Sequence, residues 1–151
     1  MRFRMGVIAV FTAATLVVPV TMLEASAAGR APVSFGRVQY DSPGSDRGSN
    51  RSLNAEWIRV TNHSNKVRRL GRWTVRDEAN HVYRFPRRFR LRPHRTVQIH
   101  TGSGRNTRSD LYWDQGSYVW NNTGDRAILR SRSGARKDVC SWGDGSGSMR
   151  C

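Results

Sequence analysis

Arginine is the residue type in this sequence with the clearest potential for chemistry. The 151-residue chain contains 26 Lys and Arg against 11 Asp and Glu, a formal net charge of +15, and only Lys66 and Lys137 are lysines. A planar guanidinium binds phosphate and carboxylate oxygens in pairs, which a lysine ammonium does not. A GC-rich genome also replaces lysine by arginine without selection for a ligand, so the arginine preference alone has two explanations.

The basic residues are concentrated between Lys66 and Arg95, where eleven of them accompany only two acidic residues, Asp77 and Glu78. Alternation along the strands of this segment would place many arginines on one outward face. Such a face tracks the phosphates of a polyanion with little discrimination between bases. The alternative is a solvated face that serves only solubility. The residues predicted to bind polyanions are Arg68, Arg69, Arg72, Arg84, Arg87, Arg88, Arg90, Arg92 and Arg95.

No combination of residues indicates catalysis or a metal site. The four histidines, His63, His81, His94 and His100, are separated by 18, 13 and 6 residues, which gives no ligand pair such as His-x-His. There is no G-x-S-x-G motif and no paired acid constellation. We therefore expect a protein that is not an enzyme and that uses no metal or other cofactor.

The two cysteines, Cys140 and Cys151, lie close together at the C-terminal end. An even number of cysteines in an exported chain favours a disulfide, and the Gly/Ser-rich residues between them are flexible enough to close the loop. We expect an intrachain bond that contributes at most about 2–3 kcal/mol and stops the tail from fraying. Without a Cys-x-x-Cys motif, a redox or metal role is not indicated.

The first 27 residues have the pattern of a secretory signal peptide. Two arginines form a positive n-region, an almost uncharged apolar run covers residues 5–23, and Ala25-Ser26-Ala27 is a small-residue cleavage site. The alternative, a retained membrane anchor, is less favoured because Pro19 interrupts the run. We expect export and a mature chain that begins at Ala28. Cleavage removes two basic residues and one acidic residue, which leaves a net charge of +14.

The segments that would position these side chains are strands. Helical patterns are nearly absent after the signal peptide, and Gly, Ser, Asn and Asp clusters recur about every eight to fifteen residues, as in a β-sandwich. A polar loop is expected from residue 41 to about 53. The predicted strands are 34–40, 57–62, a hairpin of 73–77 with 82–85, then 96–100, and a closing hairpin of 127–130 with 136–141.

Tryptophan side chains offer a second kind of binding surface, because an indole face stacks on bases or sugars. Packing in the core is the favoured interpretation for Trp73, which follows Gly71. Tyr112, Trp113 and Tyr118 lie in or near a predicted loop, so this set is expected to be more exposed, with partial burial.

Several short motifs occur in a recognisable order: Glu56-Trp57-Ile58-x-Val60-x-Asn62, Leu70-x-x-Trp73-x-Val75-x-Asp77, Tyr83-x-Phe85, His100-Thr101-Gly102-x-Gly104, Trp120-Asn121-Asn122-x-Gly124-Asp125-x-Ala127-x-Leu129 and Asp138-Val139-Cys140-Ser141. The series resembles the lamin tail domain, and most closely its small secreted versions from actinobacteria. This resemblance covers about residues 34–142. It implies an all-β, immunoglobulin-like β-sandwich that acts as a binding or scaffolding module and has no catalytic residues to carry over.

The predicted organisation is a signal peptide at 1–27, a lamin-tail-like domain at 28–142 and a Gly/Ser-rich tail at 143–151 closed by the disulfide. Two functions remain open for this secreted, monomeric protein. One is binding of nucleic acid or another anionic polymer of the cell envelope through the arginine-rich face. The other is a structural or protein-interaction role at the envelope, with the basic face serving only solubility.

Overall fold

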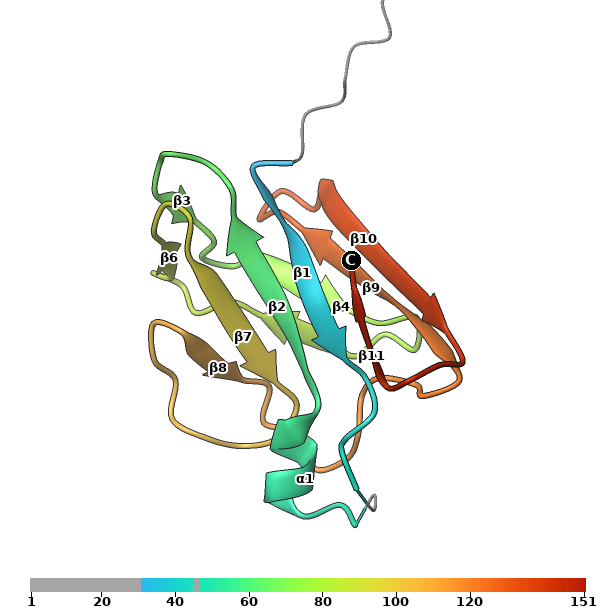
Figure 1. Cartoon of the computed structure of the whole chain (residues 1–151). Coiled ribbons are helices and arrows are strands. Elements are labelled where there is room, and N and C mark those ends of the chain that lie inside the picture. Colours follow the sequence, from blue (N-terminus) through green and yellow to red (C-terminus); the bar gives the residue numbers. More distant parts are fainter. Residues whose placement is uncertain (1–30, 45–46) are drawn as a thin grey trace, which may run out of the picture.

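The computed structural model describes residues 31–44 and 47–151 (Figure 1). The predicted signal peptide at 1–27 and the cleavage before Ala28 lie outside these residues. Within the described part of the chain, no helix has the length and apolar character needed to cross a membrane.

The larger sheet has five strands in the order β11-β1-β2-β7-β8. All neighbours are antiparallel except β7 and β8, which pair in parallel. A long loop over residues 101–109 makes this parallel crossover. The strands are β1 (Val33–Gln39), β2 (Trp57–Asn62), β7 (Thr96–His100), β8 (Asp110–Tyr112) and β11 (Ser148–Arg150).

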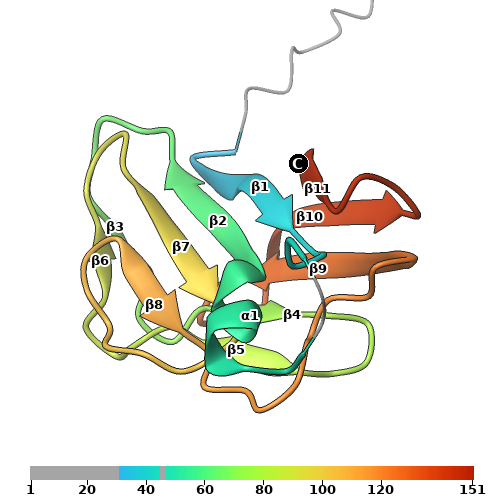
Figure 2. The same cartoon turned by 60° about the horizontal axis from the view of Figure 1, so that its bottom comes forward.

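The second sheet has four antiparallel strands in the order β10-β9-β4-β5, and a separate two-stranded ribbon joins β3 to β6. Figure 2 shows the two main sheets as separate layers. The predicted immunoglobulin-like β-sandwich is confirmed. The strands are β3 (Arg68–Arg69), β4 (Thr74–Arg76), β5 (Val82–Arg84), β6 (Arg90–Leu91), β9 (Gly124–Arg130) and β10 (Arg136–Gly143).

Alternation of side chains along the strands builds the core between the sheets. In β2 and β7, Ile58, Val60, Val97 and Ile99 point inward and are buried, while polar neighbours such as Arg59 and Gln98 point outward. The four-stranded sheet contributes its own buried set from every second position: Val75, Tyr83, Ala127 and Leu129. This two-residue period is why the inward faces of the strands were predictable from the sequence.

A chain of aromatic contacts runs through the core. The ring centroids of Tyr83 and Trp113 are 5.7 Å apart, Trp113 and Trp120 are 5.7 Å apart, and Trp120 and Trp142 are 5.5 Å apart; Tyr40 then stacks on Trp142 at 5.3 Å. All five side chains are buried. Trp113 was expected among the more exposed aromatics, and this was wrong, because the ring fills space between the sheets that the sequence alone does not show.

Helix α1 (Asn50–Ala55) lies where a polar loop was predicted, which is a correction. The helix has six residues, and the side chain of Ser49 caps its first turn by accepting a hydrogen bond from the backbone amide of Ser52. Leu53 is its buried contact with the rest of the domain. Such a short helix is stable only through packing of this kind, so the polar composition gave little indication of it.

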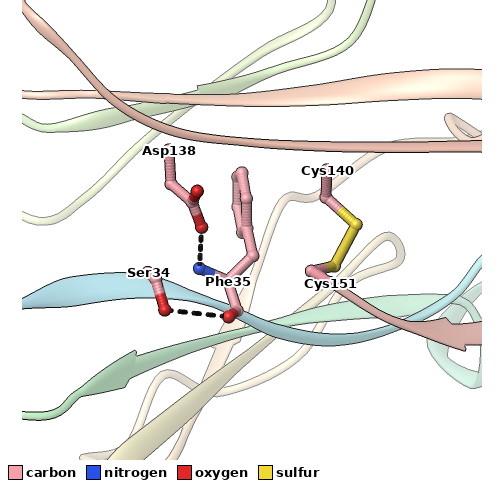
Figure 3. The surroundings of a disulfide bond; sticks show 5 residues. All are labelled: Ser34, Phe35, Asp138, Cys140 and Cys151. Atoms are coloured by element: carbon pink, nitrogen blue, oxygen red, sulfur yellow. Dashed lines mark hydrogen bonds between the residues drawn. A yellow bond between two sulfur atoms is a disulfide. The ribbon is translucent and has the colours of Figure 1, made fainter. Parts of the chain in front are cut away.

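The C-terminal segment is part of the fold. β11 pairs with β1 and forms one edge of the five-stranded sheet, and the amide of Cys151 donates to the carbonyl of Gly36 (2.8 Å). The Cys140–Cys151 disulfide joins β10 of one sheet to the residue after β11 of the other (Figure 3). The predicted pairing is confirmed, and its place shows that the bond crosslinks the two layers.

Candidate anion-binding groove

The basic segment folds into one long antiparallel hairpin. β3 pairs with β6 and β4 pairs with β5. Between these pairs, the amide of Leu70 donates to the carbonyl of Phe89 (3.0 Å), and the amide of Arg72 donates to the carbonyl of Phe85 (3.1 Å). The ribbon therefore continues from the four-stranded sheet to its far end at β3 and β6.

The far end of the hairpin is fixed to the five-stranded sheet by Asn62, the last residue of β2. Its side-chain amide donates to the carbonyls of Leu91 (3.1 Å) and Arg92 (3.0 Å), and its backbone amide donates to the carbonyl of Arg95 (3.0 Å). Asn62 is fully buried, so these bonds are shielded from water. One side chain thus positions the backbone that presents the arginines of residues 90–95.

Eight of the nine predicted arginines are exposed, and the ninth, Arg68, is partly buried with its Nε donating to the hydroxyl of Ser64 (3.0 Å). The hairpin buries its apolar side chains instead, including Leu70, Phe85 and Leu91. Burial of these alternate positions leaves the intervening arginines outside, where their charge is accessible to a ligand.

A surface groove of about 720 Å³ runs along β6 and the start of β7. Arg88, Arg90, Arg92 and Arg95 line it, together with the apolar side chains of Val67, Phe89 and Leu91. Val67 is 51% exposed, which is unusual for a valine in a folded domain. The groove therefore combines a strongly cationic rim with apolar surface.

Arg108 also lines this groove and was missed by the sequence analysis. It belongs to the crossover loop between β7 and β8, which places residues 107–109 opposite the hairpin. The amide of Gln98 on β7 donates to the carbonyl of Ser109 (2.8 Å) and holds this part of the loop. The only signal in the sequence was an arginine in a polar loop, and its partner segment could not be identified without the parallel pairing.

The charge of the groove is uncompensated. Among the described residues, no Asp or Glu lines it. In the described part of the chain, Arg126 forms an ion pair with Glu78 (3.3 Å), and neither residue lines the groove. The nearest acidic residue along the loop, Asp110, accepts a hydrogen bond from Ser109 (2.6 Å), and its Oδ1 lies 3.1 Å from His100 Nε2. A cleft lined by one sign of charge concentrates counterions and attracts anionic partners.

The hydrogen bond from Ser109 lowers the pKa of Asp110, and His100 and Thr107 act in the same direction. The carboxylate is therefore ionised at neutral pH, and its hydrogen bonds with Ser109 and Thr107 organise the crossover loop. Ser109 and Thr107 both line the groove, so the acid–hydroxyl cluster supports its wall.

The other predicted arginines lie outside the groove lining. Arg69 is the direct cross-strand partner of Arg90. Arg72 has a left-handed backbone (φ 67°) in the tight crossing beside Gly71, and Arg84 lies on the outer side of the four-stranded sheet opposite Thr74. The predicted set is thus divided: four of the nine line one groove, and the rest are distributed along the same hairpin.

The histidines have separate structural partners. His81 Nδ1 contacts Asp77 (2.5 Å), His94 contacts Asn65 (2.7 Å), and His63 contacts Ser34 (2.9 Å). Among residues 31–44 and 47–151, no group of three or more His, Cys, Asp or Glu could hold a metal ion.

The Tyr112 ring lies on the outer side of the five-stranded sheet, where neighbouring residues cover it. His100 stacks on it with 4.9 Å between ring centroids, and a Cβ placed on Gly104 would lie 2.4 Å from the Tyr112 ring. The crossover loop therefore packs directly against the ring, and Tyr112 cannot serve as a stacking platform for a base or sugar.

Comparison with known proteins identifies the family of this sandwich. The sequence profile of the Lamin Tail Domain matches residues 26–144, most of the chain. A search of curated proteins gave no match. The profile covers the four-stranded sheet, the five-stranded sheet except β11, the basic hairpin and the buried Asn62 that holds it, so the chain belongs to the lamin tail domain family.

Proposed function

We propose that this protein is an exported, non-catalytic binding module that engages polyanions through the groove lined by Arg88, Arg90, Arg92, Arg95 and Arg108. Lamin tail domains are non-enzymatic, immunoglobulin-like domains, which agrees with a binding role. The observation that carries the proposal is the collection of five guanidinium groups in one groove with no carboxylate in its lining.

The ligand class follows from the chemistry of the groove. Arginine forks bind phosphate oxygens in pairs, and a repeating phosphate backbone presents them at short, regular intervals. Nucleic acid and phosphate-rich envelope polymers share this backbone. Because no base-reading geometry is implied by exposed arginines alone, we expect sequence-independent binding.

Export from the cell places the domain where such polymers occur. The signal peptide predicted at 1–27 supports export, and the Cys140–Cys151 disulfide is typical of proteins from oxidising compartments. In this proposal a single domain is released after cleavage, acts as a monomer, and needs no cofactor.

The test is a fluorescence-anisotropy titration of duplex DNA, heparin and a teichoic acid at 50 and 200 mM salt. If five phosphates are neutralised, the wild-type affinity for DNA falls roughly 500-fold between these salt concentrations. Arg90→Gln with Arg92→Gln leaves three contacts, so the affinity of the double variant falls only roughly 40-fold.

A matched control removes the same charge elsewhere. Arg47 and Arg51 are exposed, next to or within α1, at the end of the sandwich away from β6 (Figure 1). Arg47→Gln with Arg51→Gln should retain the wild-type salt slope. If both double variants lose affinity equally, net charge and not the groove governs binding. If the wild type does not bind at 50 mM salt, the proposal is wrong.

A second function, docking of a protein partner, is favoured by one observation. Val67 and Phe89 place apolar surface inside the cationic groove, which would suit an acidic segment carrying an apolar side chain. Salt-insensitive binding of one protein from a cell-envelope extract, lost in Val67→Ser, would support this alternative. Binding of that kind does not require affinity for DNA.

A further inference from the structure

The outer face of the four-stranded sheet carries a second group of arginines. In the strand register, Arg136 on β10 lies opposite Arg130 on β9, Arg130 lies opposite Thr74 on β4, and Thr74 lies opposite Arg84 on β5. Adjacent strands are about 4.8 Å apart, so one row across all four strands contains three arginines, with Arg136 next to an irregularity in the β10 register.

The next row of the same face adds Arg76, which lies opposite Ile128 on β9. Its position is diagonal to Arg130, within reach of a long side chain. Inward positions between them, Val75 and Leu129, are buried in the core, which confirms that the arginines are on the outer side. Four arginines from four strands thus share one small area of sheet.

Two of these arginines have buried donors without a partner. The Nε atoms of Arg76 and Arg130 are shielded from water and make no hydrogen bond. The rest of each guanidinium is held in place, because Arg76 Nη2 donates to the side chain of Asn80 and Arg130 Nη1 donates to the carbonyl of Gly134 (3.0 Å). A buried, unpaired donor on a charged group destabilises the folded state, so both arginines are held on this face at a cost in stability.

Carboxylates of the described residues do not pair with these arginines. Among the described residues, Glu78 pairs with Arg126, at the end of β9 away from Arg130. Asp138 lines a shallow hollow of about 540 Å³ next to Arg136, but its Oδ2 accepts the backbone amide of Phe35 (2.7 Å; Figure 3). The face therefore has fixed, adjacent cations without an ion pair to a carboxylate among the described residues.

Stability alone does not account for this arrangement. Arg136 and Arg130 are direct cross-strand partners, and like charges in such positions destabilise a sheet. A bound oxyanion would offset this repulsion, since it neutralises the guanidinium groups and accepts from their accessible N–H donors. Phosphate is the group whose oxygens match guanidinium forks arriving from several directions.

We propose that the outer face of the four-stranded sheet, centred on Arg76 and Arg130, is a second binding surface for the phosphates of a phosphodiester polymer. The groove lies at the side of the sandwich, along β6 and β7, whereas this face belongs to β10, β9, β4 and β5 (Figures 1 and 2). One monomer therefore presents two phosphate-binding surfaces in different directions. It follows that the protein bridges two polymer chains, a consequence that rests on the proposed function of the groove.

The test is a capture assay with two DNA duplexes, one immobilised on beads and one fluorescent in solution. Wild-type protein should retain the fluorescent duplex on the beads in 100 mM salt. Each phosphate contact contributes a factor of roughly eight to affinity at this salt concentration, so Arg76→Gln with Arg130→Gln weakens the second surface roughly 60-fold. This variant should lose capture while its anisotropy titration keeps the salt slope of the groove. The control variant Arg47→Gln with Arg51→Gln should capture like the wild type.

The outcomes separate the two proposals. If the wild type binds one duplex but captures no second one, the groove proposal stands and the proposal of a second surface is wrong. Undiminished capture by the Arg76/Arg130 variant also overturns it. Light scattering without DNA decides whether a protein dimer makes the bridge: a dimer overturns the inference, and a monomer supports it. Circular dichroism of the variant checks folding, which should be intact because two unpaired donors are removed.

Discussion

Arg69 and Arg90 lie directly opposite each other across the two-stranded β3–β6 ribbon. Both are exposed, and their neighbours Leu70 and Leu91 are buried. The apolar neighbours stabilise the ribbon and offset the repulsion between the two guanidinium groups. The two like charges repel each other at the end of the basic hairpin, and a bound anion would reduce this repulsion.

Arg69→Glu should convert the repulsion into an ion pair with Arg90. We expect the free energy of unfolding to rise by about 0.2–1 kcal/mol at low salt, with a smaller gain at high salt because exposed charges are screened. Urea denaturation at 20 and 300 mM salt measures this. Arg47→Glu makes the same change in charge without a facing arginine, and an equal gain there would attribute the effect to net charge. Groove affinity for DNA should fall in Arg69→Glu, because Arg90 is then engaged.

Gly71→Ala should disrupt the crossing of the hairpin. A Cβ at this position would lie 2.1 Å from the backbone carbonyl oxygen of Arg87, so the two chains must separate. Overpacking of this kind costs about 1–3 kcal/mol. Gly116→Ala is the matched control, since nothing lies within 4 Å of its added Cβ. Chemical denaturation of both variants checks the prediction, and equal stability would show that the crossing is not tight in solution.

Reduction of the Cys140–Cys151 disulfide should release the C-terminal strand without unfolding the sandwich. The bond closes a loop with a sequence separation of 11, and its loss should cost about 2–3 kcal/mol of unfolding free energy on the chain-entropy model. The amide of Tyr40, which donates to Gly147, and that of Cys151 should exchange hydrogen faster after reduction. Hydrogen exchange with and without reductant measures this. Unchanged exchange at both amides would show that β11 pairing does not depend on the disulfide.

The pKa of Asp110 predicts how acid affects the crossover loop. Its folded-state pKa is lowered, chiefly by the hydrogen bond from Ser109, so the carboxylate stabilises the fold at pH values above its unfolded-state pKa. That contribution is lost as the pH falls through the folded-state pKa. In Ser109→Ala the pKa should rise towards its ordinary value, which an NMR titration of the Asp110 carboxyl carbon measures. Since the side chain is 39% exposed, the effect on stability should be small.

The unpaired donors of the outer sheet face make a prediction of their own. Removing Arg130 as Arg130→Gln eliminates a buried Nε without a partner and the repulsion from Arg136. The melting temperature should therefore stay the same or rise in the absence of anions. Added duplex DNA should raise the melting temperature of the wild type more than that of the variant. A large loss of stability without DNA would indicate that Arg130 has a purely structural role.

Much of the sandwich could be predicted from the sequence because strand alternation is a local property. The strands 57–62 and 96–100 were predicted with the limits that the structure shows, and Ile58, Val60, Val97 and Ile99 face the core as expected. Turn residues located the hairpins. The disulfide was predictable because the chain has only two cysteines, close together in the sequence.

Helix α1 and strand β11 were not predicted, since both depend on partners far away in the chain. The helix is too short for propensity to indicate it and is held by burial of Leu53. β11 has three residues in a Gly/Ser-rich segment, and its strand conformation comes from pairing with β1 more than a hundred residues earlier.

The excess of arginine, its concentration between Lys66 and Arg95 and the two-residue period of the strands were determined by the sequence itself. Which arginines share a surface was decided only by the tertiary structure. The parallel β7–β8 crossover adds Arg108 to the groove, and the register of β10, β9 and β4 places Arg136 opposite Arg130 and Arg76 diagonal to it. The physical reason is that alternation follows from the backbone of one strand, whereas neighbours across strands depend on the register between segments distant in sequence.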